Sequence, residues 1–190
     1  MTEVQLKMQD AATQMRLAIA NSTDERIFRS CINSYISLAR SVTFVMEAHS
    51  STPPLMAWYK NQMEKIGSAP LFRFFNSQRV HSIHKGVVRP RAKSYPITEG
   101  SFRQEVSPDG KSRLVVEMTI ASNTFPASIS DIVTTMPNGS ISVWCFDGIE
   151  DYIPGDTGNV LRLCEQYFLI LQWLVQEWLL ERQCLGSPAS

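Results

Sequence analysis

The chain has 190 residues, of which 44% are hydrophobic, and its 18 basic and 18 acidic residues leave no formal net charge. Such a chain can bury a core, which excludes a largely disordered protein and favours one globular domain, with room for an inserted subdomain. Because the total charge is balanced, any attraction for anions must come from a local patch.

No targeting or membrane segment is predicted. The first ten residues mix charged and apolar side chains, unlike a secretory signal. The most apolar stretch, residues 167–180, is interrupted by two glutamines and a glutamate. It is also shorter than the roughly 20 residues that a bilayer span requires. We therefore expect a cytoplasmic protein with no membrane partner.

Helical spacing of apolar residues dominates the first half of the chain. The predicted helices cover residues 4–20, 25–49, 53–66 and 70–84. Ser22 and Glu25 form a capping box that would begin the second helix, because each side chain can bond the backbone of the other. Gly86 is suited to end the fourth. Residues 1–86 are thus predicted to form an antiparallel helical bundle.

The pattern then changes to one rich in β-branched residues. Strands are predicted at residues 114–120, 132–135 and 140–146, with turns at residues 108–110 and 137–139. The predicted fold class is α+β, mainly α: a helical bundle with a small antiparallel β-sheet inserted before the last helix. The predicted domains are the bundle, the sheet, an acidic loop with the final helix, and a tail, at residues 1–86, 87–148, 149–183 and 184–190.

Neither a metal site nor a cofactor is expected from the sequence. The four cysteines are scattered, without the close spacing of a zinc site or a disulfide framework: Cys31, Cys145, Cys164 and Cys184. His81 and His84 stand three residues apart on the predicted fourth helix, but the sequence offers no third ligand near them.

The charges are distributed unevenly along the chain. No acidic residue stands between Glu64 and Glu99, whereas this interval holds two histidines and the cations Lys65, Arg73, Arg79, Lys85, Arg89, Arg91 and Lys93. Conversely, no Lys or Arg stands between Arg113 and Arg162, where six acidic residues occur. The first interval is predicted to attract anions and the second to repel them.

Arg79 occupies an unusual position on the predicted fourth helix. At about 100° per residue it shares a narrow sector with Phe72, Phe75 and Ile83. A guanidinium directed toward apolar neighbours must be paired or must hold an anion. Two other arrangements are open: its head reaches water while its stem lies along the apolar surface, or it pairs with a carboxylate such as Glu47.

At these residues the chain resembles the HEPN superfamily, in which an Arg-x4-6-His motif ends a helical bundle. The motif here is Arg79-Val80-His81-Ser82-Ile83-His84. Residues 28–46 and the Trp58-Tyr59 pair add to the resemblance, which covers about residues 1–86. The chain departs from the family at Val80, where a polar residue is common.

The resemblance implies a metal-independent endoribonuclease that acts as a homodimer, often as a toxin or in phage defence. Arg79 would stabilise charge on the reacting phosphate, and His84 would act as general base or acid. The RNA backbone would be held by His81, Lys85, Arg89, Arg91, Lys93 and Arg73. His84 lies about 140° around the helix from Arg79, so a second subunit would complete the site. The expected partners are RNA, a second copy and a protein such as an antitoxin.

Two other classes of function fit the same residues. Some HEPN proteins serve as binding scaffolds, so the chain is also compatible with a non-catalytic dimeric module that binds nucleic acid, a nucleotide or a protein. A pure protein-interaction protein would use the final helix, where Trp173 and Trp178 are either a contact surface or part of the core.

Overall fold

The computed structural model describes residues 1–84, 86–96, 99–106, 112–120, 123–128, 134–135 and 140–186, and the side chains of residues 1–82, 86–94 and 142–185. The helices of this part of the chain are α1 Glu3–Ala20, α2 Glu25–Ala48, α3 Pro53–Gly67, α4 Pro70–His84 and α5 Val160–Gly186. A short 3₁₀ turn, η2 Ile149–Asp151, precedes α5. The protein is therefore mainly helical, as the sequence predicts.

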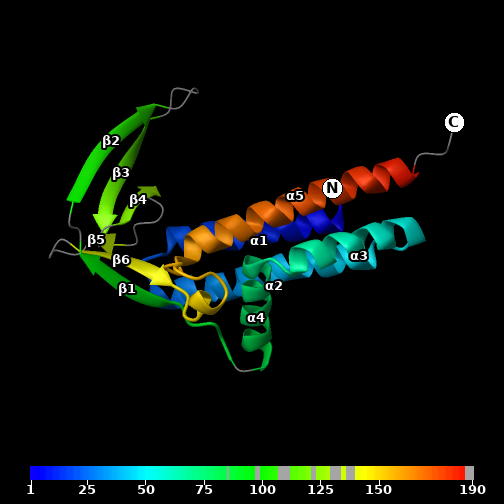
Figure 1. The fold of residues 1–190 in the computed structure, drawn as a ribbon, viewed down its shortest axis with the longest axis horizontal. Helices are drawn as coiled ribbons and strands as arrows, with labels where there is room; N and C mark the ends of the chain where they lie inside the picture. The colour runs from blue at the N-terminus through cyan, green and yellow to red at the C-terminus, as the bar shows by residue number, and fades with distance from the viewer. Residues whose placement is uncertain are drawn as a thin grey trace.

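The long helices share one direction and α4 crosses them. Figure 1 shows α1, α2, α3 and α5 running along the long axis of the molecule, with α4 at a steep angle to them. The strands gather at one end of these helices, and the C-terminal end of α5 lies at the other. The fourth predicted helix thus crosses the other helices of the bundle instead of running along them.

The strands within the described residues form two antiparallel sheets, where the sequence analysis predicted one. The first sheet has the order β1-β6-β5 and the second has the order β2-β3-β4. Their bounds are β1 Arg91–Pro96, β2 Glu99–Val106, β3 Ser112–Ile120, β4 Asn123–Ser128, β5 Thr134–Thr135 and β6 Ser140–Cys145. Because β1 and β6 pair, the two ends of the insertion meet next to the bundle. Both predicted turns, at residues 108–110 and 137–139, lie outside the described residues.

The first sheet contributes side chains to the helical core. Trp144 and Phe146, at the end of β6 and just beyond it, are buried. The Trp144 ring stacks on Phe28 of α2 at 4.9 Å, and the Phe146 ring meets Phe74 of α4 edge-on at 5.3 Å between centroids. Aromatic pairs of this kind add to the hydrophobic stabilisation of burial. β1 and β6 are consequently anchored to α2 and α4.

Buried polar groups in the bundle find partners on other helices. The Trp178 Nε1 donates to Ser50 Oγ at 2.9 Å, and the Tyr35 hydroxyl donates to the Cys164 carbonyl at 2.6 Å. Burial raises the pKa of Tyr35 well above its ordinary value and also raises that of the Cys164 thiol. Such bonds offset the cost of removing polar atoms from water, so they fix α5 against α2 and the end of the bundle.

The second helix begins at a different cap from the one predicted. Asp24 is the N-cap of α2, and its Oδ1 accepts a hydrogen bond from the Ile27 N–H at 2.9 Å. The carbonyl of Ser22 instead accepts from the Trp144 Nε1 at 2.8 Å. An aspartate at the N-cap also interacts favourably with the positive end of the helix dipole, which a serine does not.

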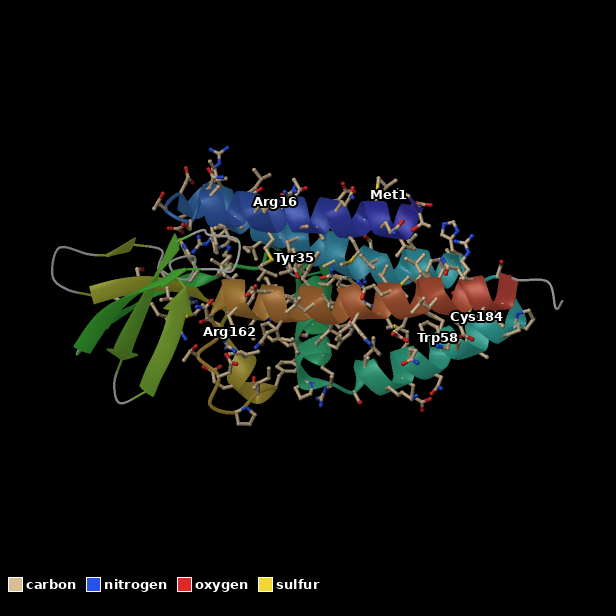
Figure 2. The ribbon with its side chains drawn as sticks, turned by 90° about the horizontal axis from the view of Figure 1, so that it is seen from above. Met1, Arg16, Tyr35, Trp58, Arg162 and Cys184 are labelled. Atoms are coloured by element: carbon tan, nitrogen blue, oxygen red, sulfur yellow. The ribbon has the colours of Figure 1, made fainter. Side chains whose placement is uncertain are left out.

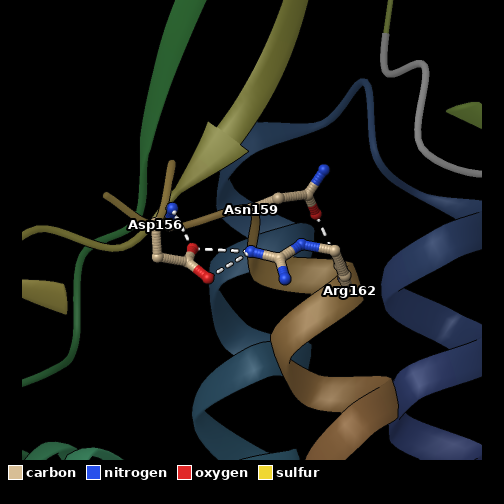
Figure 3. Close-up of polar contacts among 4 residues, drawn as sticks. Asp156, Asn159 and Arg162 are labelled. Carbon is tan, nitrogen blue, oxygen red and sulfur yellow. Dashed lines mark hydrogen bonds and ion pairs between the residues drawn. The ribbon is translucent and has the colours of Figure 1, made fainter. Parts of the chain in front are cut away.

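The start of α5 is fixed by its own polar cluster (Figure 3). Asn159 Oδ1 accepts from the Arg162 N–H at 3.1 Å, as an N-cap side chain does. The Arg162 Nη2 reaches both carboxylate oxygens of Asp156 at 2.6 Å, and Asp156 also accepts from the Gly158 N–H at 2.7 Å. The helix extends to Gly186, past the predicted end, so the first three residues of the predicted tail are helical. None of the helices described is both long and apolar enough to cross a lipid bilayer.

Candidate nucleic-acid interface

The aromatic face of α4 fixes this helix against α5 and β6. Phe72, Phe74 and Phe75 are buried, and the Phe75 ring stacks on Tyr167 of α5 at 4.4 Å. Phe74 also meets Tyr152, which follows η2, at 5.5 Å. Phe72 and Phe75 of the predicted apolar stripe are therefore buried, whereas the side chain of Ile83 lies outside the described residues.

The segment that follows α4 is pinned to α2 by two side chains. Asn33 donates to the Val88 carbonyl and accepts from the Val88 N–H, both at 2.8 Å. Arg29 Nε donates to the Pro90 carbonyl at 3.1 Å. Gly86, at φ +116°, turns the chain in a conformation that favours glycine. These contacts hold residues 86–91 along α2 and present Arg89 outward.

A cleft of about 740 Å³ opens between α2, α4 and this segment. We call it the central hollow. It is lined by Arg29, Gln78, His81, Gly86, Val87, Val88, Arg89, Arg91, Phe146 and Asp147. Three arginines and a histidine thus face the same space from two helices, the segment after α4 and a strand. The predicted backbone-binding residues His81, Arg89 and Arg91 are among them.

Asp147 is the acidic group of the central hollow, and it engages one of the arginines. Arg91 Nε lies 3.0 Å from Asp147 Oδ2, and both side chains are at least half exposed. Arg29 forms an ion pair with Glu25 and lies over the Trp144 ring at 5.8 Å. Within the described part of the chain, Arg89 and His81 are exposed and have no side-chain partner. The hollow therefore keeps a net positive character.

Two further hollows adjoin the central one. The first, of about 570 Å³, shares Arg29, Val87 and Arg89 with it and adds Arg26 and other residues of α2. The second, also about 570 Å³, shares Gln78 and His81 and is completed by Arg73, Asn76, Ser77, Val80 and Tyr152. We call the three hollows together the basic groove. The Arg73 guanidinium lies 5.8 Å from the centroid of the Tyr152 ring, which places a cation and an aromatic ring at this end.

The groove includes four of the six residues predicted to bind a nucleic-acid backbone: Arg73, His81, Arg89 and Arg91. Lys93 is half-buried on β1 and does not line it. Lys85 lies outside the described residues. For His84, the backbone ends α4 and the side chain lies outside the described residues.

Arg79 is directed to a different place. Its Cζ lies 4.8 Å from the centroid of the Phe44 ring on α2, and it does not line the basic groove. Arg79 and His81 are two positions apart, so at about 100° per residue they lie on nearly opposite sides of α4. Among the described residues Arg79 has no ion pair, so the predicted alternative of a bond to Glu47 is wrong.

Sequence reasoning did not identify Arg26, Arg29, Asn33 or Tyr152 as site residues. These residues lie on α2 and after η2, far along the chain from the stretch between Glu64 and Glu99 that holds no acidic residue. The only signal in the sequence is that Arg26 and Arg29 add two cations to one end of α2. No spacing rule connects that end with residue 88, because the Asn33 bonds are tertiary contacts.

We expect Asn33→Ala to destabilise the protein and to loosen the groove. The change removes the bonds to both backbone groups of Val88, which is buried, so a cost of about 1–3 kcal/mol is expected. Urea unfolding measures it. Asn61→Ala, at an exposed position of α3, is the matched control and should change stability by less than about 0.5 kcal/mol. Equal stability of the two variants would contradict the pinning.

The chemistry that the groove can perform follows from its side chains. Guanidinium groups suit phosphate oxygens, and the amides of Asn76 and Gln78 can both donate and accept. Within the residues that the structure describes, no three His, Cys, Asp or Glu side chains lie close enough to hold a metal ion. The chain matches no protein-family model, and comparison with curated proteins and with solved structures gives no match either.

Proposed function

We propose that the protein binds single-stranded nucleic acid, with RNA as the expected ligand, along the basic groove. The observation behind this proposal is the juxtaposition of Arg29, Arg89 and Arg91 with His81 in one hollow that adjoins two others. Each hollow has a volume in the range of a small-ligand site, roughly 300–1,000 Å³. Three hollows that share lining residues suit a short polymer better than they suit one nucleotide.

A single strand fits the groove better than a duplex does. Arg73 and Tyr152 at one end supply a cation and a π-face, on which an unpaired base can stack. Bases inside a duplex are not available for such stacking. The side chains of Asn76 and Ser77 beside them can bond a ribose 2′-hydroxyl, which distinguishes RNA from DNA.

A titration of a labelled single-stranded RNA of about ten nucleotides tests the proposal. With three or four phosphates contacted, the logarithm of the association constant should fall with the logarithm of salt concentration at a slope of about −2 to −3. Fluorescence anisotropy provides this measurement. A slope near zero, or no binding at the lowest salt, would contradict polyanion binding.

RNA cleavage is the second candidate, and His81 is the observation that favours it. An imidazole beside guanidiniums can transfer a proton while the cations stabilise phosphate charge, without a metal. Cleavage in chelator should be compared for the wild type, Arg79→Ala, His84→Ala and His81→Ala. Loss of cleavage in Arg79→Ala and His84→Ala supports a site completed by a second subunit. Loss only with His81→Ala supports cleavage in the groove, and equal activity in all four excludes both.

A further inference from the structure

Two guanidinium groups from different helices share one phenyl ring on the side of α4 that faces away from the basic groove. Arg40 Cζ lies 4.7 Å and Arg79 Cζ lies 4.8 Å from the centroid of Phe44. The two Cζ atoms are therefore at most about 9.5 Å apart, the limit reached if the ring lies between them. Like charges at this separation repel unless an anion lies near them.

Neither cation is neutralised by a carboxylate in the described part of the chain. Arg40 Nη1 donates to Thr43 Oγ1, a neutral group on the same helix, and its Nε is buried without a hydrogen-bond partner. Arg79 has no hydrogen bond or ion pair there, and both side chains are half-buried. Packing, rather than charge pairing, holds these two groups in place.

The surroundings of Arg40 place this pair where four helices meet. Burial raises the pKa of Tyr59 on α3 to about 12, with Glu47 adding to the rise and Arg40 acting against it. Burial also raises the pKa of Tyr167 on α5 to about 12, again opposed by Arg40. Glu47 is thus the nearby acidic group on α2, and it is exposed and forms no ion pair with either arginine.

We infer that Arg40, Phe44 and Arg79 form a second anion-binding site, distinct from the basic groove, that takes a phosphate group. A dianion matches two cations that have no carboxylate partner. A phosphate at hydrogen-bond distance can bridge two guanidiniums whose central carbons are up to roughly 8 Å apart, and the shared ring allows a shorter separation, with the anion on the side of the cations that faces away from the ring. Phe44, 41% exposed, forms an apolar wall beside the charged groups.

Phosphate suits the site better than a carboxylate does. A carboxylate carries one charge and two coplanar acceptor oxygens, so it is best satisfied by one arginine. A terminal phosphate carries nearly two charges near neutral pH and has three acceptor oxygens in a tetrahedral arrangement. It can therefore accept from both arginines at once. The phosphate is either free or the end of a small phosphorylated ligand.

The arginine Nε–Hε signals in an NMR titration with inorganic phosphate, at matched ionic strength, test the site. We expect saturable shifts of the Arg40 and Arg79 signals. Arg79→Gln should weaken the affinity at least tenfold, whereas Arg16→Gln, at an exposed position of α1, should leave it unchanged. Shifts of these signals that match those produced by sodium chloride alone, or an unchanged affinity in Arg79→Gln, would overturn the inference.

Two further experiments distinguish a free phosphate from a phosphorylated ligand, and the second anion-binding site from the basic groove. Adenosine 5′-monophosphate that binds more tightly than inorganic phosphate indicates a phosphorylated ligand, and equal binding of the two indicates the free anion. Adenosine itself should not bind, and binding as tight as that of the monophosphate would overturn the proposal. If 5′-hydroxyl RNA binding is unaffected by Arg40→Gln, which removes the other cation of the second site, while phosphate binding is lost, the two sites are independent. If both are lost, the second site is part of the RNA site and the inference fails.

Discussion

Trp178→Ala should destabilise the protein by about 3–5 kcal/mol, as is usual when a buried tryptophan is truncated. The Trp178 ring is completely buried in the bundle, and its Nε1 donates to Ser50 Oγ at 2.9 Å. The substitution leaves a cavity and removes the partner of a buried hydroxyl. A loss of this size is a large part of the stability of an ordinary domain, so much of the variant should be unfolded at 37 °C.

The matched control for this prediction lies on the same helix. Trp173 is 46% exposed, so Trp173→Ala should cost clearly less, about 1 kcal/mol or below. Chemical unfolding of the three proteins, followed by circular dichroism, provides the comparison. If Trp173→Ala cost as much as Trp178→Ala, the placement of α5 against α2 would be wrong.

Removing two arginines from the central hollow should reduce the affinity for single-stranded RNA about 100-fold at low salt. Each charge-assisted hydrogen bond contributes about 1.5–3 kcal/mol, which is about tenfold or more in affinity. Arg89 has no partner in the described part of the chain, so Arg89→Gln removes only a ligand contact. Arg91→Gln also leaves the Asp147 carboxylate without its ion pair, directed at an anionic ligand.

Two controls make the arginine result specific. Arg16→Gln removes the same charge from the exposed surface of α1 (Figure 2), outside the groove, and should change affinity by less than about twofold. Asp147→Asn removes the acidic group of the central hollow and should tighten binding, because Arg91 is then released from its ion pair while the pair of Arg29 with Glu25 is unchanged. Anisotropy titrations measure all the variants. Weaker binding by Asp147→Asn would contradict an electrostatic groove.

The helices could be predicted because apolar spacing reports which face of each is buried. Of the two tryptophans that the sequence left as either a contact surface or part of the core, Trp178 is buried and Trp173 is 46% exposed. The beginning of α2 could not be assigned in the same way. Ser22 and Asp24 are both suitable caps, and the Ser22 carbonyl is used by Trp144, 122 residues away. Local patterns do not contain such contacts.

The basic groove could be predicted in part, because His81, Arg89 and Arg91 are near one another in the sequence. Arg29 joins them only through the bonds of Asn33 and Arg29 to the segment after α4. Asp147 belongs to the acidic interval, yet the pairing of Arg91 with Cys145 on β6 brings it beside Arg91. The charge of the groove thus depends on strand register, which charge patterning along the chain does not specify.

Arg79 is another residue whose tertiary neighbours could not be predicted from the sequence. Its place beside Phe72 and Phe75 on the helical wheel agrees with its half-buried side chain. The wheel could not identify its neighbour, because Phe44 stands on another helix and is not an acid. The catalytic role implied for Arg79 and His84 stays a prediction, for which the cleavage assay is the test.

Photocrosslinking locates the nucleic acid on the surface and tests the basic groove most directly. A short RNA with 4-thiouridine at each position in turn is irradiated in complex with the protein, and the crosslinked peptides are identified by mass spectrometry. We predict crosslinks in residues 73–91, in the first half of α2 and at Tyr152. Crosslinks confined to α1, to α3 or to the exposed face of α5 around Trp173 would contradict the account.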